Sequence, residues 1–334
     1  MAMSGVDLPP VRPQGALQRP GALRRLMADY GQELIVLAAI IVLFVVVTAV
    51  NPRFISANNL TAIFSGNAYI AVAAIGMAMV IVTGNIDVSI GALIGVLATI
   101  SGTLAVSGYP IWVAWFFPVL VGMAINALIG VLVAYFRIPS IVVTLGALSI
   151  LRGGLISVTG GTWISDLPPA FLIAQQRLFG LPVPLIVMAV LTVLAALWMR
   201  YSAFGRSLYA VGGNPEAAVA TGIPIERRIV AVFILNGFFA GLATILFATQ
   251  LQVIQSTVPP NLELTIIMAA VIGGVSILGG SGTVIGSTLA AILFATIGSA
   301  LIFVNVSAYW LRAVIGLLIL ATVLADMLRR RRSV

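Results

Sequence analysis

The chain contains long apolar stretches, each close to the length that a helix needs to cross a lipid bilayer. The clearest stretch runs unbroken from Leu34 to Val47. Backbone groups in lipid must be paired within their own segment, so such stretches favour helices. At about 20 residues per crossing, we predict an all-α, polytopic membrane protein of about ten transmembrane helices, near residues 33–50, 58–82, 87–107, 111–135, 139–157, 182–199, 229–251, 262–278, 283–303 and 307–326.

Composition agrees with a lipid environment and excludes several chemistries. Of the 334 residues, 61% are hydrophobic and 8% are charged, whereas soluble domains carry about 25% charged residues. The chain has no cysteine, histidine or lysine. Disulfides, thiolate metal sites, histidine bases and the phosphate-binding lysine of a P-loop are therefore excluded. We predict no catalytic residue, no metal site and no enzymatic activity.

The arginines predict the orientation of the chain. All 17 basic residues are arginine, and most lie at residues 12–25, at Arg137, in the segment 200–228 and at Arg329 to Arg332. Cytoplasmic loops carry an excess of such residues, and ten alternating spans bring these sets to one side, with both termini cytoplasmic. Eight spans remain an alternative if two weaker segments are re-entrant. No basic face forms, so nucleic acid is not a predicted partner despite the net charge of +8.

Three regions follow from this topology. Residues 1–30 are polar and rich in proline and arginine, which predicts a flexible cytoplasmic tail. Residues 31–328 form the transmembrane domain, with a cytoplasmic connection at 200–228, and residues 329–334 form a basic cytoplasmic C-terminus. The segments Met79–Ile94 and Ala270–Ile285 resemble each other, each with a glycine-containing break between apolar spans. Internal duplication and chance similarity of apolar sequences both explain this resemblance.

The connection 200–228 contains a short helix with defined ends. Gly212-Gly213-Asn214 is typical of a turn, Asn214 can cap a helix, and proline is favoured at the first helical position, here Pro215. Glu216 would then lie in the first turn, where the helix dipole stabilises a carboxylate. Gly222 and Pro224 end the helix near Thr221. Its small residues would fit closely into a groove of another protein, although an ordinary interfacial connector explains them too.

Four sequence blocks in register resemble one family of membrane proteins. They are FGRSLYAVGGNPEAAVATGIPIERR at Phe204–Arg228, GMAMVIVTGNIDVSIG at Gly76–Gly91, PSIVVTLGALSILRGG at Pro139–Gly154 and AAVIGGVSILGGSGTVIGS at Ala269–Ser287. Together they resemble the permeases of ATP-binding-cassette importers for ribose, xylose, arabinose and galactosides. The resemblance covers about residues 50–320. Asn85 and Ser299-Ala300 depart from the usual pattern, which leaves the substrate open.

The resemblance implies a permease subunit in a bacterial cytoplasmic (inner) membrane that translocates a small neutral sugar. The partners it implies are a cytoplasmic ATP-binding subunit, an extracytoplasmic substrate-binding protein, and a second permease copy or a paralogue. No cofactor is expected in this chain, because the partner subunit uses the ATP. Rhamnose, inositol-like polyols and autoinducer-2 are further candidate substrates. The residues implied to dock on the ATPase are Glu216, Ala217, Ala218 and Gly222, with Arg206 and Asn214 supporting the loop.

Asp87 is one of the few acids near the apolar spans, in a glycine-flanked break. It can cap the following helix at the cytoplasmic surface, or it can serve in gating with Gly84 and Gly91 as hinge positions. Polar residues inside spans are candidates for the substrate path, because a neutral sugar needs hydroxyl and amide partners. Packing or hydrogen bonding between helices is the more common explanation for each of them. They are Asn67, Asn126, Thr144 and Asn236.

Two other classes of function remain as alternatives. A secondary, ion-coupled transporter of a small polar solute would place charged residues inside its spans. Here the charges that come nearest are predicted at span ends, at Asp87, Arg152, Glu263 and Arg312. A scaffold or a membrane-embedded enzyme is the third class, but the remaining Asp, Glu, Ser and Tyr residues form no convergent motif.

Overall fold

The computed structural model describes residues 22–257 and 259–307, and the positions 309, 310, 313, 314, 316, 317, 320 and 324. Most of the tail predicted at residues 1–30 therefore lies outside the described residues. So do much of the predicted span 307–326, including Arg312, and the basic segment 329–334.

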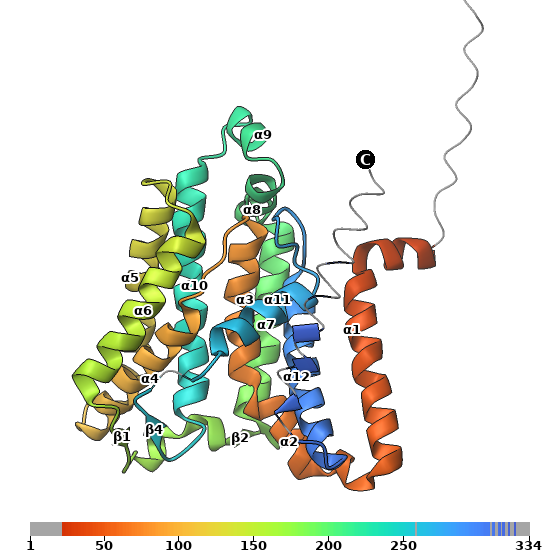
Figure 1. Ribbon diagram of the computed structural model, residues 1–334, viewed down its shortest axis with the longest axis vertical. Coiled ribbons are helices and arrows are strands. Elements are labelled where there is room, and N and C mark those ends of the chain that lie inside the picture. The colour runs from red at the N-terminus through yellow and green to blue at the C-terminus, as the bar shows by residue number, and fades with distance from the viewer. Residues whose placement is uncertain are drawn as a thin grey trace, which may run out of the picture.

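The described chain is a bundle of upright helices (Figure 1). The long helices are α1 (Ala22–Val50), α3 (Ala68–Val82), α5 (Ile111–Ala134), α6 (Ser140–Thr159), α7 (Val183–Tyr201), α10 (Ile225–Ala248) and α12 (Val284–Phe303). The shorter ones are α2 (Ala57–Gly66), α4 (Ile90–Val106), α8 (Ala203–Gly213), α9 (Pro215–Ala220) and α11 (Leu262–Ile272), with 3-10 turns at Pro52–Ile55, Pro169–Phe171 and Ile173–Gln175.

Seven helical segments among the described residues are long and apolar enough to cross a membrane, with α2 and α3 counted as one. The predicted spans 87–107 and 262–278 are different, because α4 has 17 residues and α11 only 11. A helix of 11 residues rises about 16 Å, which is about half of the bilayer core. The multi-span, mostly helical architecture is confirmed, while the count of ten and the side of the termini stay predictions.

The core forms around α3. Every residue of α3 except Tyr69 is buried, and α7, α10, α11 and α12 all pack against this helix. Helices α5 and α10 pack against each other along much of their length, and glycines allow their backbones to approach. A Cβ added at Gly122 would lie 2.9 Å from the carbonyl oxygen of Gly237, and one at Gly130 would lie 2.9 Å from Phe233 Cβ. The face that Gly122 and Gly130 share with Asn126 is therefore a packing face.

Helix α1 stands at the edge of the bundle, along α12 (Figure 1). Its polar residues contact the neighbouring helix ends. Gln32 Nε2 donates to the carbonyl oxygen of Ile272 at 3.1 Å, and the Thr283 hydroxyl donates to the buried Glu33 carboxylate. These contacts fix α1 to both ends of the segment that joins α11 to α12.

Two small antiparallel sheets close the end of the bundle that is opposite α9 (Figure 1). Strand β1 (Trp163–Ile164) pairs with β4 (Ile254–Gln255). Strand β2 (Arg177–Leu178) pairs with β3 (Leu181–Pro182) in a hairpin. The β1–β4 pairing joins the long connection after α6 to the connection that leads into α11.

A glycine exchange tests the α5–α10 contact. A Cβ at Gly237 would lie 2.7 Å from the Gly122 carbonyl carbon, so Gly237→Ala should lower the free energy of unfolding by about 1–3 kcal/mol through overpacking. Gly146→Ala on α6 is the matched control, because no atom lies within 4 Å of the added Cβ. Thermal unfolding of the purified protein in detergent measures both. Equal melting temperatures for the two variants would contradict the prediction.

Candidate functional site

Two non-helical segments and helix α8 meet at the end of the bundle that carries α9. Residues 83–89 join α3 to α4, and residues 273–283 join α11 to α12. The amide of Gly280 donates to the carbonyl oxygen of Val82 at 2.8 Å, and Tyr209 Oη of α8 donates to the carbonyl oxygen of Gly282 at 2.9 Å. The breaks of the two similar sequence segments, Met79–Ile94 and Ala270–Ile285, are therefore in direct contact.

Gly212 makes this meeting of three segments sterically feasible. The turn predicted at Gly212-Gly213 is wrong, because both glycines lie in the last turn of α8. A Cβ at Gly212 would overlap the Val82 carbonyl oxygen and lie 2.8 Å from the Gly280 nitrogen. The other side of the contact consists of Gly279 and Gly280, with φ of 84° and 76°, a region that glycine occupies without strain.

Asp87 lies in the protein interior. Its side chain has no exposed surface, and Oδ1 accepts from the backbone nitrogen of Ser89 at 2.8 Å and from its hydroxyl. Oδ2 accepts from Asn236 Nδ2 at 2.8 Å. Asn236 is in the middle of α10, which places Asp87 well inside the bundle. The prediction of a cap at the cytoplasmic surface is therefore wrong about location, although the local bonds to Ser89 are those of a cap.

Several of the predicted hinge and path residues lie in or next to the segment 83–89. Gly84 is the second residue of this segment and has φ +79°, and Gly91 is the second residue of α4. Thr144 Oγ1 lies 3.4 Å from the Ile86 carbonyl oxygen, and Ser140 Oγ accepts from the Ile86 nitrogen at 3.2 Å. Helix α6 thus supplies polar partners to the broken backbone.

The four predicted path residues do not form one cluster. Thr144 and Asn236 both flank the segment 83–89 and are fully buried. Asn126 is also fully buried, and its amide atoms have no hydrogen-bond partner among the described residues. Asn67 is half-buried at the break between α2 and α3. Their role in the path stays a prediction.

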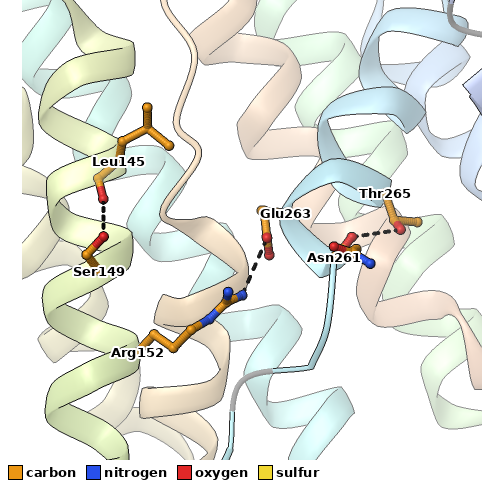
Figure 2. Close-up of polar contacts among 6 residues, drawn as sticks. All are labelled: Leu145, Ser149, Arg152, Asn261, Glu263 and Thr265. Carbon is orange, nitrogen blue, oxygen red and sulfur yellow. Dashed lines mark hydrogen bonds and ion pairs between the residues drawn. The ribbon is translucent and has the colours of Figure 1, made fainter.

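The first turns of α4 and α11 meet inside the bundle. Glu263 is in the first turn of α11, and a Cβ at Gly91 would lie 2.5 Å from Glu263 Oε2 and 2.7 Å from its nitrogen. Arg152 of α6 reaches the same carboxylate, with Nη2 at 3.5 Å from Oε1 (Figure 2). No group of three or more acidic side chains that could hold a metal ion occurs among the described residues.

Sequence reasoning missed this charged contact. It placed Arg152 and Glu263 at span ends, because hydropathy alone does not show that α11 begins inside the bundle. The signal was Pro259-Pro260-Asn261, since two prolines and a following Asn stop a helix and begin another. Asn261 has φ +59° and is the N-cap of α11.

Helix α9 has the ends that its sequence predicts. It runs from Pro215 to Ala220, and Asn214 Oδ1 accepts from the Ala217 nitrogen at 3.0 Å. Gly222 follows with φ +81°. Arg206 Nη1 donates to the Tyr201 carbonyl oxygen at 2.7 Å, which ties α8 to the end of α7. The predicted short, capped helix is confirmed.

The exposed face of α9 differs in part from the predicted docking set. Glu216, Ala217 and Gly222 are exposed, but Ala218 is only 3% exposed and packs inward. Val219, which sequence reasoning did not select, is 60% exposed. α9 therefore presents Glu216, Ala217 and Val219, and Ala218 anchors it to the bundle.

Comparisons with known proteins identify relatives over most of the chain. The model of the family described as "Branched-chain amino acid transport system / permease component" matches residues 59–323. The autoinducer 2 import system permease protein LsrC of Salmonella typhi is 38% identical over 301 residues, covering 88% of this chain and 85% of LsrC. The LsrC of Escherichia coli (strain K12 / DH10B) is 37% identical, with 88% and 86% covered. No solved structure matches.

The Asp87–Asn236 contact is testable by a matched pair of substitutions. Asn236→Ala removes the donor to the buried Asp87 Oδ2, and an unsatisfied buried acceptor costs about 1–3 kcal/mol. Asn126→Ala is the control, since Asn126 is equally buried but loses no hydrogen bond. We expect Asn236→Ala to have the lower melting temperature in detergent. A control that melts as low as Asn236→Ala would show that cavity formation alone accounts for the loss.

Proposed function

This chain belongs to the family of transport-system permease components that matches residues 59–323, and it is a multi-pass protein of the cytoplasmic membrane. We propose that it is the permease subunit of an ATP-binding-cassette importer that translocates a small neutral sugar-like solute. A separate ATPase subunit would supply the energy, and an extracytoplasmic binding protein would deliver the solute. The observation that carries the proposal is the exposed, capped helix α9 at the end of α8.

Helix α9 is suited to transmit movement to the broken helices. It is anchored by Ala218 and continues from α8, whose Gly212 lies against both Val82 and Gly280. A bound ATPase that displaces α9 would therefore also displace the segments 83–89 and 273–283. We assign the ATPase contact to Glu216, Ala217 and Val219, with Gly222 at the end of the helix and with Arg206, Asn214 and Ala218 supporting the fold of the loop.

Opening of the path would then occur where the helices are already interrupted. We assign hinge roles to Gly84 and Gly91, with Asp87 as the latch between them and α10 through Asn236. Thr144, Asn126 and Asn236 would reach a solute only after the helices separate, because all three are fully buried here. Asn67 is the one of the four that is half-buried at a helix break.

The class of solute rests on the relatives. Proteins named as autoinducer 2 import permeases are 37–38% identical to this chain, which favours a sugar-like solute. The family description names branched-chain amino acids, so an amino acid such as leucine is the second candidate. A second permease copy or a paralogue would complete the importer.

An uptake experiment in sealed membrane vesicles tests the proposed function. The vesicles contain the complete importer, with its ATPase subunit and its binding protein. Autoinducer 2, D-ribose and L-leucine are the probes. We expect ATP-dependent uptake of autoinducer 2 or D-ribose, but not of L-leucine. Uptake of L-leucine would reassign the solute, and uptake by this chain alone on an ion gradient would establish the alternative of a secondary transporter.

A matched pair of acidic residues tests the docking surface. Glu216 and Glu226 lie in the first turns of α9 and α10, so replacing either one by alanine removes the same interaction with a helix dipole. Glu216→Ala should weaken ATPase binding by about tenfold or more, since a hydrogen bond to a charged group contributes about 1.5–3 kcal/mol. Glu226→Ala should bind the ATPase normally. Co-purification and titration of the ATPase subunit measure both, and equal affinities would contradict the assignment.

A further inference from the structure

Glu263 is a buried carboxylate with one oxygen unused. Its side chain is 8% exposed, and Oε2 has no hydrogen-bond partner among the described residues. Its other oxygen has only the 3.5 Å contact with Arg152 (Figure 2). An unpaired charged acceptor in the interior is costly, so a hydrogen-bond donor that reaches Oε2 would be bound favourably.

The unused oxygen lies against the first turn of α4. A Cβ at Gly91 would lie 2.5 Å from Glu263 Oε2, so the lack of a side chain at Gly91 allows this oxygen to lie directly beside the start of α4, and a solute would reach it only when the two helix ends separate. The first amides of a helix have no partner within it, and Ser89 does not cap α4, because its hydroxyl donates to Asp87 instead. The start of the 17-residue α4 therefore presents free donors and the positive end of the helix dipole.

The side chain of Arg152 is partly exposed at the surface of the bundle. Its side chain is 42% exposed, although it lies in α6 among apolar residues that face outward, such as Ile150 at 73% exposed. A guanidinium exposed to lipid is costly, and such residues face a water-filled cavity or the interior of the assembly. The exposed side of Arg152 therefore faces water or the interior of the assembly and not lipid.

A groove lies between α4 and α6, and its lining includes a neighbour of Arg152 in the sequence. Its volume is about 430 Å³, within the range of about 300–1,000 Å³ that is typical of small-molecule sites. It is lined by Leu151, next to Arg152, and further on by Val96, Thr99, Thr103 and Thr159. A mainly apolar groove beside the charged pair would hold a polar solute only weakly.

We propose that Glu263, Arg152 and the first turn of α4 form a solute-binding station within the translocation path. The ligand is a neutral polyhydroxyl compound: its hydroxyls donate to Glu263 Oε2 and accept from the Arg152 guanidinium and the α4 amides. A carboxylate beside a guanidinium can satisfy both roles of a hydroxyl group. The proposal rests on the importer function proposed above and names the residues that bind the solute.

Thiol labelling tests whether the station is open to water. The native chain has no cysteine, so a single introduced thiol is the only reactive group. Ser149→Cys is one turn from Arg152 on the same face of α6 and leaves the pair intact, while Val45→Cys, 65% exposed on the apolar α1, is the control. Because only the hydrated thiolate reacts, a membrane-impermeant methanethiosulfonate should modify Ser149→Cys about tenfold faster or more. Equal rates would overturn the proposal.

Uptake by charge variants tests the binding role in the complete importer, with the probe that wild-type vesicles accumulate. Loss of one charged hydrogen bond should lower uptake about tenfold or more in Arg152→Gln and Glu263→Ala. Glu263→Gln should retain more uptake than Glu263→Ala, because its amide oxygen still accepts. The solute should also slow labelling of Ser149→Cys, but not when Glu263→Ala is added.

The double variant Arg152→Gln with Glu263→Gln separates the station from a structural ion pair. A station loses both of its charged groups and stays inactive, whereas a pair that only ties α6 to α11 would recover uptake once both charges are gone. Recovery would overturn the proposal. If the wild-type vesicles import no polyhydroxyl probe, the proposed function fails. If they do and the single variants import it normally, only the station fails.

Discussion

The rest of the structure depends on the need to pair every backbone polar group that lies deep in the bundle. Lipid supplies no hydrogen bonds, so irregular backbone at this depth must be enclosed by protein. The segments 83–89 and 273–283 meet this need with each other and with side chains. Gly280 pairs with Val82, and Ser140 of α6 accepts from Ile86. The bundle around α3 is therefore organised to enclose two interruptions.

Enclosing the interruptions also links them mechanically. Helix α8 contacts both breaks through Gly212, and the contact has no side chain that could yield. Glycine–glycine contacts of this kind transmit displacement directly, because backbones move together where no flexible side chain separates them. The same feature that closes the interior thus connects α9 at the surface to Asp87, Gly91 and Glu263 inside.

Local features could be predicted from the sequence, but the depth at which a segment lies in the bundle could not. The cap of α9 follows from Asn214 and Pro215, which act on their immediate neighbours. Hydropathy predicts α4 and α11 as full spans, because it records only that the residues are apolar. It does not distinguish an apolar helix from an apolar extended segment. Which side of α9 faces outward depends on α8 and α10, so Ala218 was assigned to the surface and Val219 was overlooked.

The contacts of α1 carry a consequence for how the chain is built. Gln32 and Glu33 pair with Ile272 and Thr283, which lie 240 and 250 residues later in the sequence. Synthesis proceeds from the N-terminus, so α1 reaches the translocon before α11 and α12 and waits with these polar groups unpaired until those helices have entered. Completion of the fold is then a late docking of α1, and a chaperone or protease that monitors membrane insertion would find these two side chains accessible until that moment.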